Sequence, residues 1–215
     1  MQQTLYTIAI WAVPVLFAIT LHEAAHGWVA NKLGDPTARQ LGRITANPIK
    51  HIDLVGTVII PLVLALSRSG FIFGWAKPVP VDPRHFKQPL LDMALVALAG
   101  PVSNFVMACG WALVITLGKT ALADSSMAIH LIQMGKAGML INIVLMVLNL
   151  VPIPPLDGGR VIAGVLPKDV ALAYMRIEPF GMWIIIALLF SGLLGKILWP
   201  VVLRFDAIIS AIFIF

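Results

Sequence analysis

The chain has 215 residues, of which 60% are hydrophobic and only 12% are charged, and its mean hydropathy is +0.95. This composition excludes an ordinary soluble globular protein and indicates an integral membrane protein. The net charge of +5 comes from basic residues scattered between apolar segments, so it indicates membrane orientation and argues against nucleic-acid binding. The single cysteine, Cys109, excludes an intrachain disulfide and a multi-cysteine zinc site.

Apolar runs long enough to cross a bilayer occur along most of the chain. We expect spans at roughly 4–31, 91–118, 134–156 and 180–199, with an amphipathic or spanning stretch at 200–215. The run 54–66 is short for a span and is broken by Pro61, so we expect it to be re-entrant. The pattern predicts one all-α polytopic membrane domain, 1–215, with about four to six transmembrane helices. The residues before the first run lack a cleavable leader, so that helix should be retained.

The sequence His22-Glu23-Ala24-Ala25-His26 lies inside the first apolar run. Because positions i and i+4 share one helix face, His22 and His26 can hold one zinc ion while Glu23 acts as general base, the H-E-x-x-H arrangement. Ionisable residues at membrane depth are costly and usually mark a functional site. The alternative is a polar cluster that only holds helices together.

A zinc hydrolase has three protein ligands and one open position, so another His, Asp or Glu is required. The extended soluble motif fails, because Val29 and Lys32 stand where it needs a glycine and a histidine. Asp157 is the favoured third ligand. It follows an apolar run in a Pro-rich segment, and the two glycines after it permit close approach to a helix. As an alternative, this segment could be a helix-ending turn.

Other candidate ligands lie outside the apolar runs. His51 and Asp53 are an alternative pair of ligands, but we expect both to be water-exposed residues of an interfacial loop. His85 and His130 are expected in solvated loops.

Asp157 can reach the histidines only if both motif helices end on the same side of the membrane. The segment from 54–66 to Phe71–Trp75 should therefore enter the bilayer and return. Most Lys and Arg residues then lie on one side, which the positive-inside rule makes cytoplasmic. We expect the N-terminus outside and the metal site open to the cytoplasm.

Together these residues make the chain resemble the site-2 proteases, the zinc metalloproteases that cut substrates within the membrane. The resemblance rests on three motifs: His22-Glu23-x-x-His26, Gly100-Pro101-x-x-Asn104 and Asn149-x-x-Pro152-x-Pro154-x-Leu156-Asp157-Gly158. It implies one Zn²⁺ per chain held by His22, His26 and Asp157, with Glu23 as catalytic base. The chain would be a compact member without PDZ-like or CBS-like modules, located in a bacterial cell membrane.

The resemblance implies an endopeptidase that cuts in or near transmembrane segments of membrane-protein substrates, with those substrates and lipid as partners. Asn104 and Asn149 are polar residues in apolar helices, so they could contact the substrate or its oxyanion, or join helices instead. The segment 73–80 could pair with an unwound substrate strand or be a structural loop. A competing function is a zinc-binding transporter or scaffold, which would not need Glu23.

Overall fold

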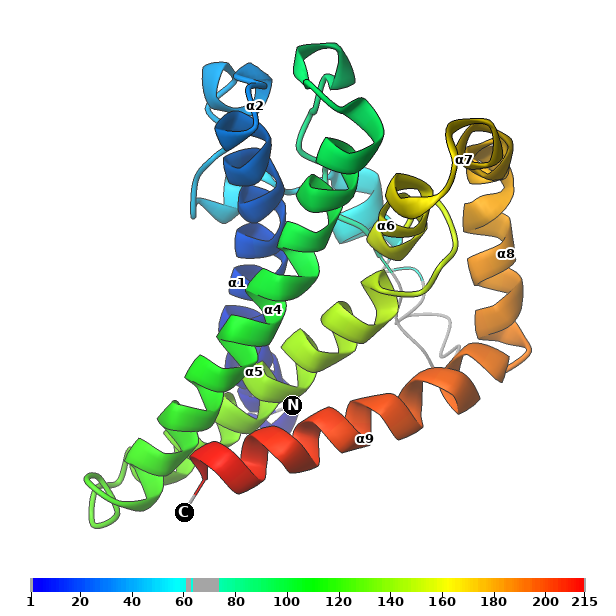
Figure 1. The fold of residues 1–215 in the computed structure, drawn as a ribbon. Helices are drawn as coiled ribbons and strands as arrows, with labels where there is room; N and C mark the ends of the chain where they lie inside the picture. Colours follow the sequence, from blue (N-terminus) through cyan, green and yellow to red (C-terminus); the bar gives the residue numbers. More distant parts are fainter. Residues whose placement is uncertain (1, 61–62, 64–73, 215) are drawn as a thin grey trace.

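The computed structural model describes residues 2–60, 63 and 74–214, and the regular structure within them is helical, as predicted. The long helices are α1 (Gln2–Lys32), α4 (Pro89–Lys119), α5 (Ala128–Asn149), α8 (Glu178–Phe190) and α9 (Leu193–Phe213) (Figure 1). The short helices are α2 (Thr37–Gln40), η1 (Pro48–Lys50), η2 (Leu54–Ile59), η3 (Pro83–His85), α6 (Asp157–Val165) and α7 (Lys168–Met175).

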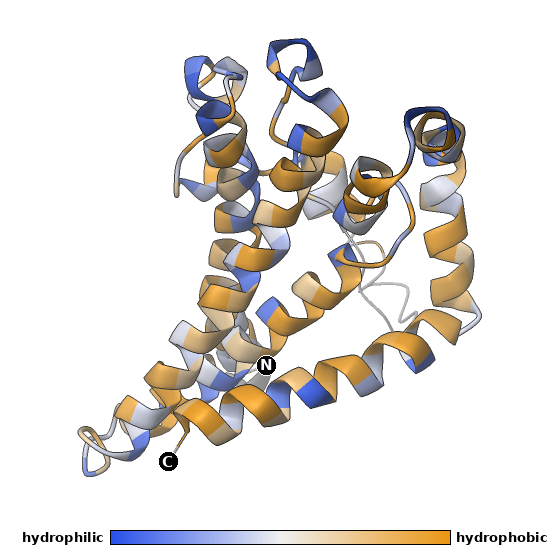
Figure 2. Cartoon of the chain, viewed as in Figure 1, coloured by the Kyte–Doolittle hydropathy of each residue, from blue (hydrophilic) through white to orange (hydrophobic). Residues whose placement is uncertain are grey.

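Among the described residues, three helical segments are long and apolar enough to cross a membrane: Tyr6–Lys32, Pro89–Lys119 and Ala128–Asn149. A fourth crossing is possible if α7 and α8, which are bent by 59° relative to each other, act as one span. Figure 2 shows apolar residues along these helices and hydrophilic residues gathered near several of their ends. The chain is therefore an all-α polytopic integral membrane protein, and its described residues supply three or four candidate spans where about four to six were expected.

The apolar run predicted at 180–199 is not one helix. It is interrupted at Gly192, whose φ of 71° lies in the left-handed region that glycine adopts at low cost. The Gly192 N–H donates to the Leu189 carbonyl at 3.0 Å, which ends α8 and lets α9 start in a new direction (Figure 1). The apolar character of α9 is interrupted by three charged residues, so α9 is not among the candidate spans: Lys196, Arg204 and Asp206.

The helices α1, α4 and α5 pack against one another and form the frame of the site. Small residues permit the closest contact, because a Cβ added at Gly138 of α5 would lie 2.3 Å from the Trp111 side chain of α4. Buried apolar residues of α4 and α5, including Ile115 and Ile143, continue this contact. The backbone that carries the histidine motif is therefore held by two neighbouring helices.

The re-entrant prediction for 54–66 falls largely outside the described residues, as does most of Phe71–Trp75. Its two described ends lie together. The Trp75 N–H donates to the Gly56 carbonyl at 3.1 Å, and the Thr57 hydroxyl donates to the Trp75 carbonyl at 2.8 Å. The chain that leaves at residue 57 is thus back at the same place by residue 75, as the predicted topology requires.

Asp35 joins the end of α1 to the loop before α4. Its side chain is fully buried and accepts hydrogen bonds from the Thr37 N–H at 3.0 Å and the Asp82 N–H at 2.7 Å. His85 Nδ1–H donates to the same carboxylate at 2.9 Å. One carboxylate therefore fixes the loops at this end of the bundle.

Candidate metal centre

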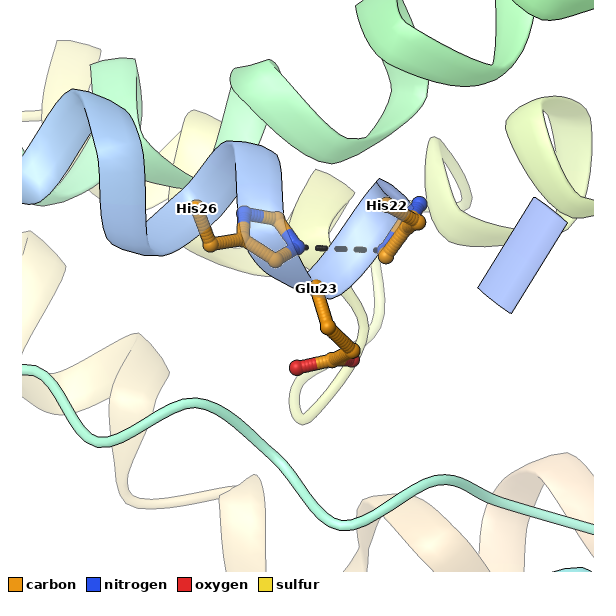
Figure 3. A group of neighbouring side chains, drawn as sticks. All are labelled: His22, Glu23 and His26. Carbon is orange, nitrogen blue, oxygen red and sulfur yellow. Dashed lines mark hydrogen bonds between the residues drawn. The ribbon is translucent and has the colours of Figure 1, made fainter. Parts of the chain in front are cut away.

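Both imidazoles of the motif are buried and held by α4. His22 Nδ1–H donates to Asn104 Oδ1 at 2.5 Å, and His26 Nδ1–H donates to the Val96 carbonyl at 2.7 Å. With hydrogen on Nδ1, a neutral imidazole keeps a lone pair on Nε2, the form in which histidine binds a metal. The two Nε2 atoms lie 3.1 Å apart (Figure 3).

Asp157 completes the group. The carboxylate lies at the start of α6, and its Oδ2 is 3.2 Å from Nε2 of His22 and 3.5 Å from Nε2 of His26. This oxygen is buried and accepts no hydrogen bond from the described part of the chain. Two imidazole lone pairs and a carboxylate oxygen therefore converge on one point, an arrangement that favours a cation.

The spacing of these atoms can be tested against zinc. Adjacent ligands on a tetrahedral zinc ion, each about 2.0–2.1 Å from the metal, lie roughly 3.3 Å apart. The three edges here are 3.1, 3.2 and 3.5 Å. The donor set of two histidines and one carboxylate also matches zinc, so the residues fit this metal.

Gly100 of α4 makes room for the two histidines. A Cβ at this position would lie 2.5 Å from His22 Cε1 and equally close to His26 Cε1 and Nε2. The sequence marked Gly100 only as part of a family motif. Its role here is steric, since any side chain would displace the imidazoles.

Glu23 projects from α1 beside the imidazoles (Figure 3). One of its oxygens and one ring nitrogen from each histidine lie within 4.8 Å of one another. The Val79 N–H donates to Glu23 Oε2 at 2.9 Å, so the carboxylate is held from the opposite side of the site. Sequence analysis did not predict this contact, because it comes from a distant, irregular segment.

The segment 74–80 turns alternate N–H groups toward the protein. Lys77 N–H donates to the His51 carbonyl at 2.9 Å, between the Trp75 and Val79 contacts. Pro78 and Pro80, which alternate with these donors, have no N–H to offer a substrate strand, whereas Ala76 has one. Of the two possibilities for residues 73–80, the geometry favours a structural loop for residues 77–80 and leaves pairing open at Ala76, while Phe73 lies outside the described part.

Two cavities lie beside the histidine motif. A cavity of about 380 Å³ reaches Asp157 and Arg160 and is lined by polar as well as apolar groups. A smaller one of about 200 Å³ lies mainly among apolar residues of α1, α5, α8 and the segment 74–76. His22, Glu23 and Asn149 border both cavities.

The rival ligands do not join the centre. His51 is 2% exposed, which contradicts the expected wetted position, and its Nε2–H donates to the Thr45 carbonyl at 3.1 Å. Burial lowers the pKa of His51, so its side chain is neutral. Asp53 instead accepts the Gly56 N–H at 2.7 Å and caps η2.

The remaining histidines also lie elsewhere. The half-exposed His85 contacts Asp35, and the exposed His130 lies 2.8 Å from the Tyr6 hydroxyl through its Nδ1.

The two asparagines named from the sequence differ in position. Asn104 is fully buried, is not among the residues lining the cavities, and donates through Nδ2 to Asn142 Oδ1 at 2.8 Å and the Ala18 carbonyl at 3.3 Å. Asn149 lines both cavities and donates to the Leu145 carbonyl at 3.0 Å. Asn149 is therefore in reach of a molecule bound in either cavity, whereas Asn104 is not.

Comparison with known proteins identifies the family of the chain. Residues 112–192 match the model of Peptidase family M50. YwhC of Bacillus subtilis, which carries the name of a zinc metalloprotease, is 40% identical over 192 residues, covering 87% of this chain and 83% of that protein. Rip2 of Mycolicibacterium smegmatis, named in the same way, is 30% identical over 183 residues, covering 84% of this chain and 66% of that protein. No solved structure matches the chain. The chain therefore belongs to peptidase family M50, the site-2 protease family of zinc metalloproteases.

Proposed function

We propose that the protein is an intramembrane endopeptidase that hydrolyses peptide bonds in or near transmembrane segments of other membrane proteins. The observation that carries this proposal is the position of the histidine motif inside a helix long and apolar enough to span a membrane. At 1.5 Å per residue, His26 and His22 lie roughly 9 and 15 Å along α1 from Lys32, where the helix ends. Cleavage there would occur below the membrane surface.

His22, His26 and Asp157 would hold one zinc ion per chain. Bound zinc supplies Lewis acidity, which activates water and polarises a peptide carbonyl. Glu23 borders the same cavity and is the only carboxylate besides Asp157 among the described residues that line it. It would accept the proton of the attacking water and pass it to the leaving amine. The Val79 N–H holds one Glu23 oxygen and leaves the other for proton transfer.

The two cavities would have different roles around the cut bond. The larger, more polar cavity would admit water, and the smaller apolar one would receive substrate side chains. Asn149 borders both and is the candidate donor to the substrate backbone or oxyanion. A transmembrane substrate must unwind locally to expose its carbonyl, so helix-weakening residues are expected near the cut.

We propose that the end of the molecule carrying α2, η1 and η3 faces the cytoplasm, with the N-terminus outside. The observation behind this orientation is the concentration of Lys and Arg in the sequence between the first and second long helices. The membrane would be that of a bacterial cell. The partners would be transmembrane substrates and lipid, with no nucleic acid.

The proposal is tested with purified, zinc-loaded protein in liposomes, using a panel of single-span membrane proteins whose helices contain Gly or Pro. We expect cleavage sites, mapped by mass spectrometry, to fall inside apolar segments. Glu23→Gln should bind zinc as the parent does but cleave at least about 100-fold more slowly. Full cleavage by zinc-loaded Glu23→Gln would exclude Glu23 as the base, and cuts confined to soluble regions would contradict an intramembrane peptidase.

A further inference from the structure

Asn142 is a fully buried polar residue in the middle of apolar α5, and nothing in the motif pattern identified it. It borders neither cavity at the catalytic residues. Its amide connects to the metal centre through one intermediate. Asn142 accepts from Asn104 Nδ2 at 2.8 Å, and Asn104 Oδ1 accepts from His22 Nδ1–H at 2.5 Å. The chain of contacts therefore runs from α5 through α4 to α1.

The direction of these hydrogen bonds is fixed by backbone carbonyls, which can only accept. Asn142 Nδ2 donates to the Gly138 carbonyl at 2.8 Å, so its Oδ1 must face Asn104. Asn104 must then present its NH₂ group to Asn142 and its oxygen to His22. That oxygen requires a hydrogen on His22 Nδ1, which leaves Nε2 as the free ligand atom.

We propose that Asn142 is a positioning residue for the zinc ligand His22, acting through the orientation of the Asn104 amide. This inference rests on the zinc site of the proposed function. Without Asn142, the NH₂ group of Asn104 keeps only the longer 3.3 Å contact to the Ala18 carbonyl, so the amide can rotate. A rotated amide presents NH₂ to His22 Nδ1, favouring hydrogen on Nε2 and blocking that atom as a ligand.

A merely structural role must be separated from this one, because Asn142 also ties α5 to α4. Thr116 provides the matched comparison. It is a buried residue of α4 whose hydroxyl donates to the Phe213 carbonyl of α9, so its loss also removes an interhelical hydrogen bond. That contact includes neither of the histidines nor Asp157.

The experiment measures zinc affinity by chelator competition for the purified protein and three variants: Asn142→Leu, Asn142→Asp and Thr116→Val. We expect Asn142→Leu to bind zinc about 10–100-fold more weakly, the usual effect of losing a residue that orients a metal ligand. In the apolar interior the Asp side chain stays protonated, so Asn142→Asp keeps one donor and one acceptor and should restore most of the affinity. Thr116→Val should bind zinc as the parent does.

Parent-like affinity in Asn142→Leu would overturn the inference, as would an equal loss in Asn142→Asp or in Thr116→Val. If Asn142→Leu does not fold, ¹⁵N NMR of histidine-labelled, metal-free parent decides the question. Hydrogen on Nδ1 of His22 supports the orienting chain, and hydrogen on Nε2 overturns it. Failure of the proposed function would show differently, as zinc-loaded parent that binds metal normally but cleaves no membrane substrate.

Discussion

The two histidines contact α4 at a glycine, and this contact can be tested at a single position. Gly100→Ala places a methyl group 2.5 Å from both imidazoles, which must then move. We expect zinc affinity to fall by about tenfold or more, because ligand orientation sets metal affinity. Gly110→Ala is the control. Gly110 lies on the same helix, and a Cβ added there meets nothing within 4 Å. Chelator competition measures both, and equal affinity in the two variants would contradict the steric role of Gly100.

The buried carboxylate of Asp35 predicts a pH-dependent stability. Burial alone would raise its pKa, but the hydrogen bonds from Thr37, Asp82 and His85 outweigh burial and lower it. A lowered pKa means that the ionised side chain contributes stability above about pH 4, and that this contribution is lost as pH falls through the folded-state pKa.

Replacing this residue should expose that contribution. Asp35→Ala leaves buried donors without an acceptor, so we expect a loss of about 1–3 kcal/mol near neutral pH. The measurement is the melting temperature of both proteins in detergent over a pH series. The difference in melting temperature between the parent and Asp35→Ala should become smaller in acid. A difference that stays constant through pH 3 would show that the ionised carboxylate does not cause it.

At the same scale, the sequence identified the chemically distinctive residues and missed those defined by contact. His22, Glu23, His26 and Asp157 could be named because ionisable groups are rare in apolar segments. The Val79 N–H and the Val96 carbonyl could not, since every residue carries such groups. Asn142 did carry a signal, as an amide inside an apolar helix, but nothing in the sequence told which side chain it contacts.

At the scale of elements, the loop 150–156 decides where Asp157 lies. It is held from outside by α7 and α8, since the Tyr174 hydroxyl donates to the Pro152 carbonyl at 2.8 Å. Gly181 of α8 lies directly against the loop, where a Cβ would fall 1.5 Å from the Pro154 carbonyl oxygen. These two helices therefore support the loop that leads to Asp157.

Displacing α8 should consequently weaken the metal centre. We expect Gly181→Ala to lower both zinc content and peptidase activity, because the loop carrying Asp157 must shift. Gly195→Ala in α9, where a Cβ meets nothing within 4 Å, should change neither. Zinc analysis of both variants makes the comparison, and a fully loaded Gly181→Ala protein would show that the loop holds its position without α8.

Helix boundaries were predicted less well than helices. The long apolar segments were found because about 20 apolar residues suffice to span a bilayer. The run 134–156 stops as a helix at Asn149, where the prolines of the loop begin, and the run 180–199 breaks at Gly192. Hydropathy averages over such a break, because a glycine in an apolar run does not reveal whether its φ is positive.

At the scale of the whole molecule, the metal centre joins α1 to α6, segments more than 100 residues apart in the sequence. Zinc that binds only the folded chain should therefore stabilise it, by about 4 kcal/mol at a concentration 1,000 times the dissociation constant. Removing zinc with a chelator should lower the melting temperature, and adding it back should restore it. The melting temperature of Asp157→Ala should not change with zinc. A parent protein whose melting temperature does not depend on zinc would contradict a ligand set shared between these helices.

The sequence also anticipated how these distant segments meet. If Asp157 is to reach His22, the segment between α1 and α4 must return to the side it left, and residues 57 and 75 do lie together. The parity of crossings predicts this return, while most of the segment predicted to be re-entrant lies outside the described residues. The close packing of α4 against α5 was beyond sequence analysis, because it depends on which faces Gly138 and Trp111 turn toward each other.

The most direct test of the central claim is the zinc content per chain of the purified parent, Asp157→Ala and Asp53→Ala proteins. The predicted result is about one zinc per chain in the parent and in Asp53→Ala, with loss of the metal in Asp157→Ala. Zinc retained by Asp157→Ala, or none in a parent prepared with ample metal, would contradict a centre built from His22, His26 and Asp157.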